Sequence, residues 1–356
     1  MTTSFTIDGN ALIWTGDGET LRIEPWEENS VRVRATRNRG FGPVDWALLE
    51  PKNESGRVAD IAVGEDGEHA SLTNGSITVK ADSNHAPLLS AGYETFRCDL
   101  SFWNAEGELL FREYPQGGSL LLKARDYTPV SGESFAVTTS FSADPKERLY
   151  GMGEYQQDVL DLKGSTFELA HRNSQASVPF VVSSKGYGFL WHNPAIGRAT
   201  FGRNRTEWAA QSTDQIDYWV TAGDSYAQIE SQYADATGHA PVMPEWGMGF
   251  WQCKLRYWNQ EQLLDVARGF KSRNIPLDLI VIDFFHWPHL GDYKFEDEFW
   301  PDPEAMVAEL NSMGVKLMVS VWPQVSVSSE NFVEMKRNNY LVSAEAGLNL
   351  DMMFEE

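Results

Sequence analysis

The sequence has few cysteines, few basic residues and no long apolar run. Its 356 residues include only Cys98 and Cys253, and 29 Lys and Arg stand against 51 Asp and Glu. Two cysteines so far apart predict free thiols rather than a disulfide framework. The formal net charge of −22 repels polyanions, which argues against nucleic acid and anionic membrane surfaces as partners and favours a neutral ligand.

Several functional classes lack their sequence signals. No stretch approaches the ~20 apolar residues of a membrane-spanning helix, and the N-terminus shows no secretory signal, so we expect a cytoplasmic protein. No Gly-rich phosphate loop or Gly-x-Ser-x-Gly elbow is present, which predicts no cofactor. His286 and His289 lie near Asp292 without further ligands, so we predict packing or hydroxyl binding there and no metal.

Aromatic residues, in contrast, are plentiful at 12% of the sequence, with 13 tryptophans. The apolar faces of sugar rings stack on aromatic side chains while their hydroxyls bind carboxylates. For any single tryptophan, core packing remains the commoner role, in roughly two cases of three. This composition is compatible with a sugar-binding protein.

Residues 1–240 have the pattern of a β-sandwich. Short alternating runs, such as residues 215–220, are separated by turn residues. Residues 178–182 and 187–191 predict a hairpin with Gly186 in its turn. A helix is expected over 224–237, capped by Asp224 and ended by Gly238.

Residues 241–356 have the pattern of parallel βα units, beginning after Pro241 and Pro244. We expect strands over 247–252, 277–282 and 315–322. Helices should begin at Asn259, with Gln262 in the reciprocal capping position, at Asp302 with Pro303, and near residue 331. Three such units cannot close an eight-stranded barrel, so we expect the start of a (β/α)8 TIM barrel in a truncated chain.

Candidate site residues follow the predicted strands, because ligands bind at the carboxyl ends of parallel strands. The second strand runs into Asp283 and three aromatic residues, and the third ends near Trp322. The candidates for substrate binding are Asp283, Phe284, Phe285, Trp287, Trp322, Lys254 and Tyr257. Two other roles stay open: Asp283 as a turn residue, with about an even chance, and Trp322 buried under the next loop.

Four segments resemble glycoside hydrolase family 31 in order and spacing. Residues 149–154, Leu-Tyr-Gly-Met-Gly-Glu, are similar to the "YGxGE" segment of this family, and residues 179–190 to its "PF…S.GYG.L" hairpin. Residues 244–253 are similar to the start of its barrel. Residues 283–287, with Trp300-Pro301-Asp302-Pro303, complete the match.

The resemblance implies a galactose-mutarotase-like β-sandwich followed by a (β/α)8 barrel, and retaining hydrolysis of α-glycosides. Retention requires two carboxyl groups. In this family the nucleophilic Asp ends the fourth barrel strand and the acid/base Asp comes later, so both are expected beyond Glu356. Asp283 matches the substrate-binding Asp of the family, and Trp322 matches an aromatic residue after the third strand.

The pair Phe284-Phe285 resembles α-xylosidases more than α-glucosidases. Xylose lacks the CH₂OH of glucose, so a Phe in that space discriminates by about 1–3 kcal/mol. The expected partners are α-xylosylated or α-glucosylated oligosaccharides, and a homo-oligomer is left open. An α-glucosidase and a non-catalytic carbohydrate-binding protein are the alternatives.

Overall fold

The computed structural model describes residues 5–42, 46–51, 59–87, 94–115 and 123–342. Contacts between Cα atoms divide the chain into two compact units, Met1–Ala240 and Pro241–Glu356. Each unit has its own hydrophobic core. None of the described helices combines the length and the apolar character that crossing a membrane requires.

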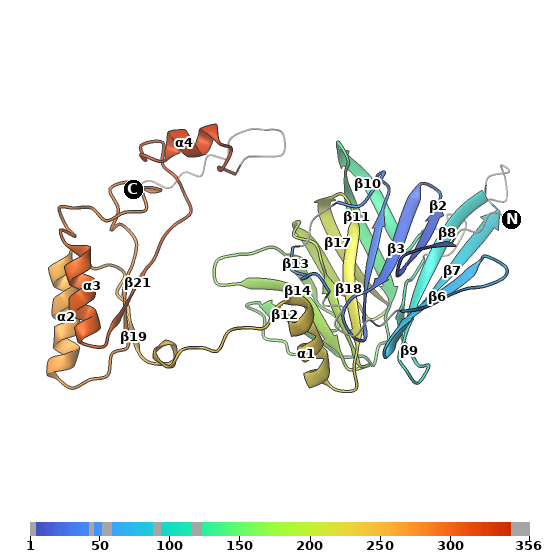
Figure 1. Ribbon diagram of the computed structural model, residues 1–356, viewed down its shortest axis with the longest axis horizontal. Helices are drawn as coiled ribbons and strands as arrows, with labels where there is room; N and C mark the ends of the chain where they lie inside the picture. Colours follow the sequence, from blue (N-terminus) through green and yellow to red (C-terminus); the bar gives the residue numbers. More distant parts are fainter. Residues whose placement is uncertain (1–4, 43–45, 52–58, 88–93, 116–122, 343–356) are drawn as a thin grey trace. The chain divides into compact units, whose positions relative to one another are not determined.

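The described residues of the first unit form three antiparallel sheets, drawn in Figure 1. The largest has the order β1 (Phe5–Asp8), β2 (Ala11–Gly16), β3 (Glu19–Pro25), β4 (Ser30–Thr36), β18 (Ile216–Ala222), β15 (Tyr187–Trp191), β14 (Ala176–Ser183) and β12 (Leu149–Glu154). The second consists of β10 (Arg125–Ser131), β11 (Ser134–Ser142), β17 (Arg205–Thr213), β16 (Gly197–Phe201) and β13 (Thr166–Leu169). The third consists of β5 (Asp60–Val63), β6 (His69–Asn74), β7 (Ile77–Pro87), β8 (Glu94–Trp103) and β9 (Leu109–Arg112).

All three sheets contribute to one core, which confirms the predicted β-sandwich. Leu21 of β3, Leu72 of β6 and Phe141 of β11 belong to the same buried cluster. Leu21 and Ile23 are buried on one face of β3, and Arg22 between them forms ion pairs on the other. Burying an aliphatic side chain of this size stabilises the fold by about 1.5–3 kcal/mol.

Helix α1 (Tyr226–Thr237) covers the outer face of the largest sheet. Trp219 of β18 and Ile229 of α1 share a second buried cluster, so β18 is buried on both faces. The predicted cap at Asp224 is wrong: Ser225 is the N-cap, and its side chain accepts a bond from the backbone N–H of Gln228. Ser225 has the extended backbone of an N-cap residue, and Asp224 lies one residue before this position.

The predicted hairpin is confirmed by antiparallel pairing of β14 with β15. Gly186 in its turn has φ of 82°, a left-handed conformation that glycine adopts without strain. Gly238 also ends α1 as predicted, with φ of 104° and its N–H bonded to the carbonyl of Ala234.

A buried ion cluster joins the three sheets of the first unit. The guanidinium of Arg125 donates to both carboxylate oxygens of Glu113, at 2.6 Å each, and to Glu19 at 2.8 Å. It also donates to the carbonyl of Cys98. Burial raises the pKa of Glu113 to about 7, although the charge of Arg125 opposes this shift. Two carboxylates thus share one buried cation.

The second unit contains a parallel sheet in the order β19 (Trp251–Gln252), β20 (Leu279–Ile282) and β21 (Lys316–Val319). Its helices are α2 (Gln260–Ser272), α3 (Pro303–Ser312) and α4 (Phe332–Arg337), and a 3₁₀ turn, η1 (Glu245–Met248), precedes the first strand. Helices α2 and α3 lie side by side (Figure 1). This is the partial TIM-barrel architecture that the sequence predicts.

All three helix starts predicted in this unit are confirmed: α4 begins after Asn331, and α2 and α3 begin with side-chain caps. Asn259 Oδ1 accepts from the N–H of Gln262 at 2.9 Å, and Gln262 Oε1 accepts in return from the N–H of Trp258 at 2.8 Å. Asp302 Oδ1 accepts from the N–H of Ala305, with Pro303 in the first turn. These caps satisfy backbone donors that the first helical turn leaves unpaired.

The predicted first strand, 247–252, is wrong over its first half. The N–H of Gly247 bonds to the carbonyl of Pro244, which makes the turn of η1. The N–H of Phe250 then bonds to the carboxylate of Asp278 at 2.9 Å instead of a strand neighbour. Only Trp251 and Gln252 pair with β20, because side-chain and turn bonds occupy the preceding backbone.

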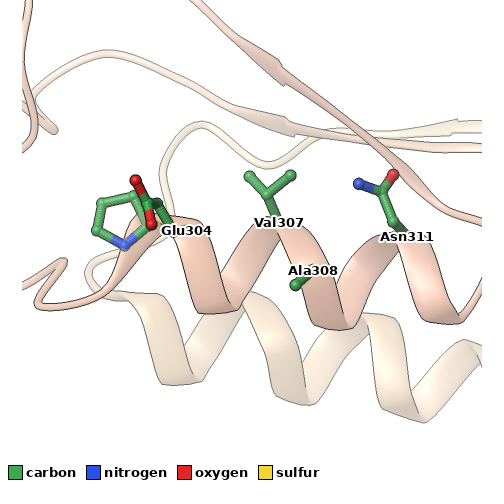
Figure 2. A pocket seen from close by; sticks show the side chains of 5 residues that line it. Glu304, Val307, Ala308 and Asn311 are labelled. Carbon is green, nitrogen blue, oxygen red and sulfur yellow. The ribbon is translucent and has the colours of Figure 1, made fainter.

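A hollow of about 450 Å³ lies along α3, and Figure 2 shows side chains that line it. Its lining consists of Pro303, Glu304, Val307, Ala308 and Asn311. These residues supply one carboxylate and one amide but no aromatic face, so we do not treat the hollow as a sugar site.

Candidate functional site

The carboxyl ends of β20 and β21 lie at the same edge of the parallel sheet. Ile282 and Val319 are register partners, and the N–H of Ser320 donates to the carbonyl of Ile282 at 2.8 Å. Asp283 therefore follows β20 at the level where Ser320 follows β21. Trp322 comes two residues after Ser320. The carboxylate of Asp283 and the indole of Trp322 therefore both follow strand ends at the same edge of the sheet.

Asp283 is partly exposed, and its conformation is fixed locally. Its carboxylate accepts a bond from the N–H of Phe284 at 2.9 Å. Its carbonyl lies 3.0 Å from Nδ1 of His286, and this nitrogen is the donor because a carbonyl can only accept. Burial lowers the pKa of His286, which favours its neutral form. The neutral imidazole thus holds the turn, and carboxylate lone pairs remain for a ligand.

Four of the predicted aromatic residues form one cluster. The ring centroid of Trp322 lies 5.4 Å from that of Phe284, 6.3 Å from that of Phe285 and 6.2 Å from that of Trp287. Phe284 and Phe285 meet edge to face at 4.6 Å. Such aromatic contacts contribute about 0.5–1.5 kcal/mol each beyond burial. The cluster forms a wall beside Asp283, of the kind on which a sugar ring can stack.

Two members of this cluster have unusual features. Phe285 has φ of 62°, a left-handed conformation that costs a bulky residue about 1 kcal/mol or more. Trp287 is only 7% exposed, and its indole N–H has no hydrogen-bond partner within the described residues. Strain and an unpaired buried donor both accumulate at binding sites more often than elsewhere.

Lys254 and Tyr257 contact each other and the core of the second unit. Tyr257 is 4% exposed and belongs to the core of the second unit, where its hydroxyl accepts from Gln252. Lys254 is exposed, with its ammonium 5.9 Å from the centroid of the Tyr257 ring. The structure thus places Tyr257 inside the core and Lys254 above it.

Arg256, which was not among the predicted site residues, approaches the aromatic cluster. Its guanidinium carbon lies 3.5 Å from the ring centroid of Trp258 and 5.1 Å from that of Phe285. Stacking between rings leaves the in-plane N–H groups of an arginine free to donate. The Arg-x-Trp spacing was the available signal, but the contact with Phe285 depends on the fold.

Both cysteines are free thiols, as predicted, with Cys98 buried and Cys253 exposed. Partial burial, and secondly the negative charge of Asp283, raise the pKa of Cys253. The raised pKa keeps the thiol of Cys253 protonated near neutral pH.

Asp292, which the sequence places near His286 and His289, anchors a loop. Its carboxylate accepts from the backbone N–H groups of His289 and Glu330, at 3.0 Å each. Within the ranges that the structure describes, no three His, Cys, Asp or Glu side chains gather as metal ligands would.

Comparison with known proteins gives family matches in both units. Residues 20–198 match the glycosyl hydrolase 31 N-terminal galactose mutarotase-like domain, and residues 240–353 match the glycosyl hydrolases family 31 TIM-barrel domain. An uncharacterised family 31 glucosidase of Pseudescherichia vulneris is 45% identical over 97% of this chain and 65% of its own length. α-Xylosidase A of Aspergillus niger is 33% identical over 92% of this chain and 45% of its own length.

Among solved structures, a soil-metagenome α-xylosidase in complex with xylose superposes with a TM-score of 0.87. It is 46% identical, and the match covers 98% of this chain and 52% of that protein. A Flavobacterium johnsoniae dextranase, at 21% identity and a TM-score of 0.79, shares the fold. The chain spans about half to two thirds of the length of these nearer relatives.

Proposed function

Because the chain belongs to glycoside hydrolase family 31, we propose that the whole protein is a retaining α-glycosidase that removes α-D-xylosyl groups from xylosylated oligosaccharides. The observation that carries this proposal is the placement of Asp283 beside the aromatic wall of Phe284, Phe285 and Trp322, at the carboxyl edge of the sheet. Similarity to the α-xylosidases of Aspergillus niger and of the soil metagenome supports it.

In this proposal Asp283 binds substrate and does not react. Its carboxylate accepts hydrogen bonds from sugar hydroxyls that lie away from the scissile bond, and such bonds strengthen as the ring flattens toward an oxocarbenium-like transition state. Trp322 and the two phenylalanines contact the apolar face of the ring. The nucleophile and the acid/base, both Asp in the family pattern, are assigned to sequence that follows Glu356.

The preference for xylose is assigned to Phe284 and Phe285. Their rings meet edge to face at 4.6 Å and both contact Trp322, so neither ring moves without disturbing the wall. A fixed ring in the space of the glucose CH₂OH excludes glucose and adds apolar contact to xylose, a discrimination of about 1–3 kcal/mol.

An α-glucosidase is the second candidate. The observation that favours it is the name glucosidase carried by the relative that is 45% identical. In that case the phenylalanine rings must leave room for the exocyclic CH₂OH of glucose.

The test uses the protein expressed from its complete gene. Hydrolysis of 4-nitrophenyl α-D-xyloside and the matching α-D-glucoside is followed by absorbance, and the first anomer released is identified by proton NMR. We expect kcat/KM at least about tenfold higher for the xyloside and α-xylose as the first product. The reverse preference would establish the α-glucosidase, and a β anomer would contradict retention.

A further inference from the structure

Trp46 is an exposed aromatic side chain in the first unit, on the described segment 46–51. Trp46 is 61% exposed. Leu48, two residues later, is only 3% exposed and packs in the buried cluster that includes Ile229 of α1. The N–H of Leu49 donates to the carbonyl of Ala236 in α1 at 2.8 Å. The segment is therefore anchored to the fold immediately after Trp46.

The buried side chain of His192 also fixes this segment, through hydrogen bonds to its backbone. Its Nε2 accepts from the backbone N–H groups of Trp46, Ala47 and Leu48, at 3.1, 3.0 and 3.4 Å. Since these donors converge on Nε2, the ring proton is on Nδ1, which lies 3.3 Å from the carboxylate of Asp217. His192 is 3% exposed, so a buried side chain fixes the backbone of an exposed tryptophan.

Asp217 in turn is held by a bidentate contact with Arg32. The two bonds measure 3.0 and 2.7 Å, and both side chains are almost completely buried. Burial alone would raise the pKa of Asp217, but the hydrogen bonds from His192 and Arg32 outweigh it and lower the pKa. The support beneath Trp46 is thus a buried network in which the ionised Asp217 is bonded to both Arg32 and His192.

A pocket of about 240 Å³ opens beside Trp46. Its wall includes Asn193, Ser212, Thr213, Asp214 and Gln215. Asn193 donates to Thr213 and accepts from the N–H of Ala195, so these polar groups are held by hydrogen bonds. The pocket therefore combines one aromatic face with a fixed polar wall.

Two groups of this pocket are available to a ligand. The carboxylate of Asp214 accepts from no other described residue, whereas its backbone carbonyl is bonded to Thr36 and Asn38 and fixes its position. The amide oxygen of Gln215 accepts from the N–H of Gly42, and one amide N–H donates to Asp217. The second amide N–H of Gln215 is available to donate to a ligand. A carboxylate, an amide donor and an exposed indole are the groups that bind a sugar ring.

We propose that this pocket of the first unit is a non-catalytic binding site for one sugar ring of a neutral oligosaccharide. The ring stacks on Trp46 and its hydroxyls donate to Asp214. The charge of Asp214 and the net charge of −22 disfavour anionic glycans. The site lies wholly within the first unit and does not depend on the proposed function.

The test measures binding by isothermal titration calorimetry, with the complete protein and three probes. These are a xylosylated cello-oligosaccharide, maltotriose and an oligogalacturonate, the last as an anionic control. Trp46→Ala is expected to weaken binding of a neutral probe at least about fivefold, or to abolish one of two binding events. Trp46→Tyr keeps an aromatic face and should restore the affinity to within about twofold.

The matched control is Tyr114→Ala, which removes another exposed aromatic side chain, 42% exposed, outside the pocket. It should bind as the wild type does. Hydrolysis of an aryl α-glycoside should be the same in Trp46→Ala and wild type, so loss of the proposed activity and loss of this site are distinguishable. Unchanged neutral-sugar binding by a folded Trp46→Ala protein, tighter oligogalacturonate binding, or altered oligomeric state without any sugar binding would each overturn the proposal.

Discussion

The carboxylate of Asp283 accepts a hydrogen bond from the N–H of its own neighbour Phe284, at 2.9 Å. The first aromatic residue of the wall and the candidate sugar anchor are thus fixed to each other by the backbone. Any substrate that reaches the carboxylate also meets the wall, so polar and apolar recognition act together.

Asp283→Ala in the complete protein should lower kcat/KM on an aryl α-xyloside by at least about a hundredfold. This corresponds to roughly 3 kcal/mol of lost transition-state stabilisation, because charge-assisted bonds to the flattening ring disappear. Asp297→Ala, which removes an exposed carboxylate later in the same loop region, serves as the control. If Asp283→Ala melts normally and keeps nearly native kcat/KM, Asp283 is only a turn residue.

Phe284→Ala and Phe285→Ala, made separately, should reveal which ring excludes glucose. In one of them the ratio of kcat/KM for aryl xyloside over aryl glucoside should fall at least about tenfold, because the space for CH₂OH opens. Steady-state kinetics on both substrates provide the ratio. If neither variant changes it, the preference for xylose does not come from this pair.

The 356-residue chain alone should show no turnover of aryl α-xyloside or α-glucoside. We assign both reacting carboxylates to sequence after Glu356, and binding residues alone cannot form or break the glycosyl intermediate. The complete protein, assayed at equal concentration, is the positive control. Turnover by the purified chain would place a reacting carboxylate within these residues.

Glu113→Gln should flatten the pH dependence of stability between about pH 4.5 and 7. Burial raises the pKa of Glu113 from 4.5 to about 7, so in this window the folded state retains a proton that the unfolded chain has released. The free energy of unfolding therefore falls as pH rises, by at most about 3 kcal/mol. In the variant this contribution disappears.

Urea unfolding of the wild type and of Glu113→Gln, from about pH 5 to about pH 8, measures the difference. Glu106→Gln removes an exposed carboxyl between β8 and β9 and should leave the pH profile unchanged. Parallel profiles for wild type and Glu113→Gln would show that Glu113 is ionised throughout.

Local signals in the sequence predicted the elements whose bonds are local. The caps at Asn259 and Asp302 and the hairpin turn at Gly186 each depend on residues within four positions. The position of Asp283 at the end of β20 was also predictable, because a continuous apolar run marks the buried strand. Asp224 failed because two adjacent residues, Asp224 and Ser225, both suit an N-cap, and only the backbone geometry selects one.

Features that depend on distant partners were not predictable. Arg32 meets Asp217 across 185 residues, and His192 meets the segment of Trp46 across 146. The contact of Arg256 with Phe285 likewise requires the parallel pairing of β19 with β20. Alternation of apolar residues identifies a strand but not its neighbour in the sheet, so sheet order and the pocket beside Trp46 appear only in three dimensions.

The two separate hydrophobic cores have a consequence for how the protein is made on the ribosome. The core of the first unit draws its members from Phe5 to Ala222, and the cluster that includes α1 ends at Ala236, so both can close once Ala236 has left the exit tunnel. The parallel strands of the second unit emerge later, after the residues of the first unit are available to fold. Nascent chains halted after Ala240 should therefore already resist proteases.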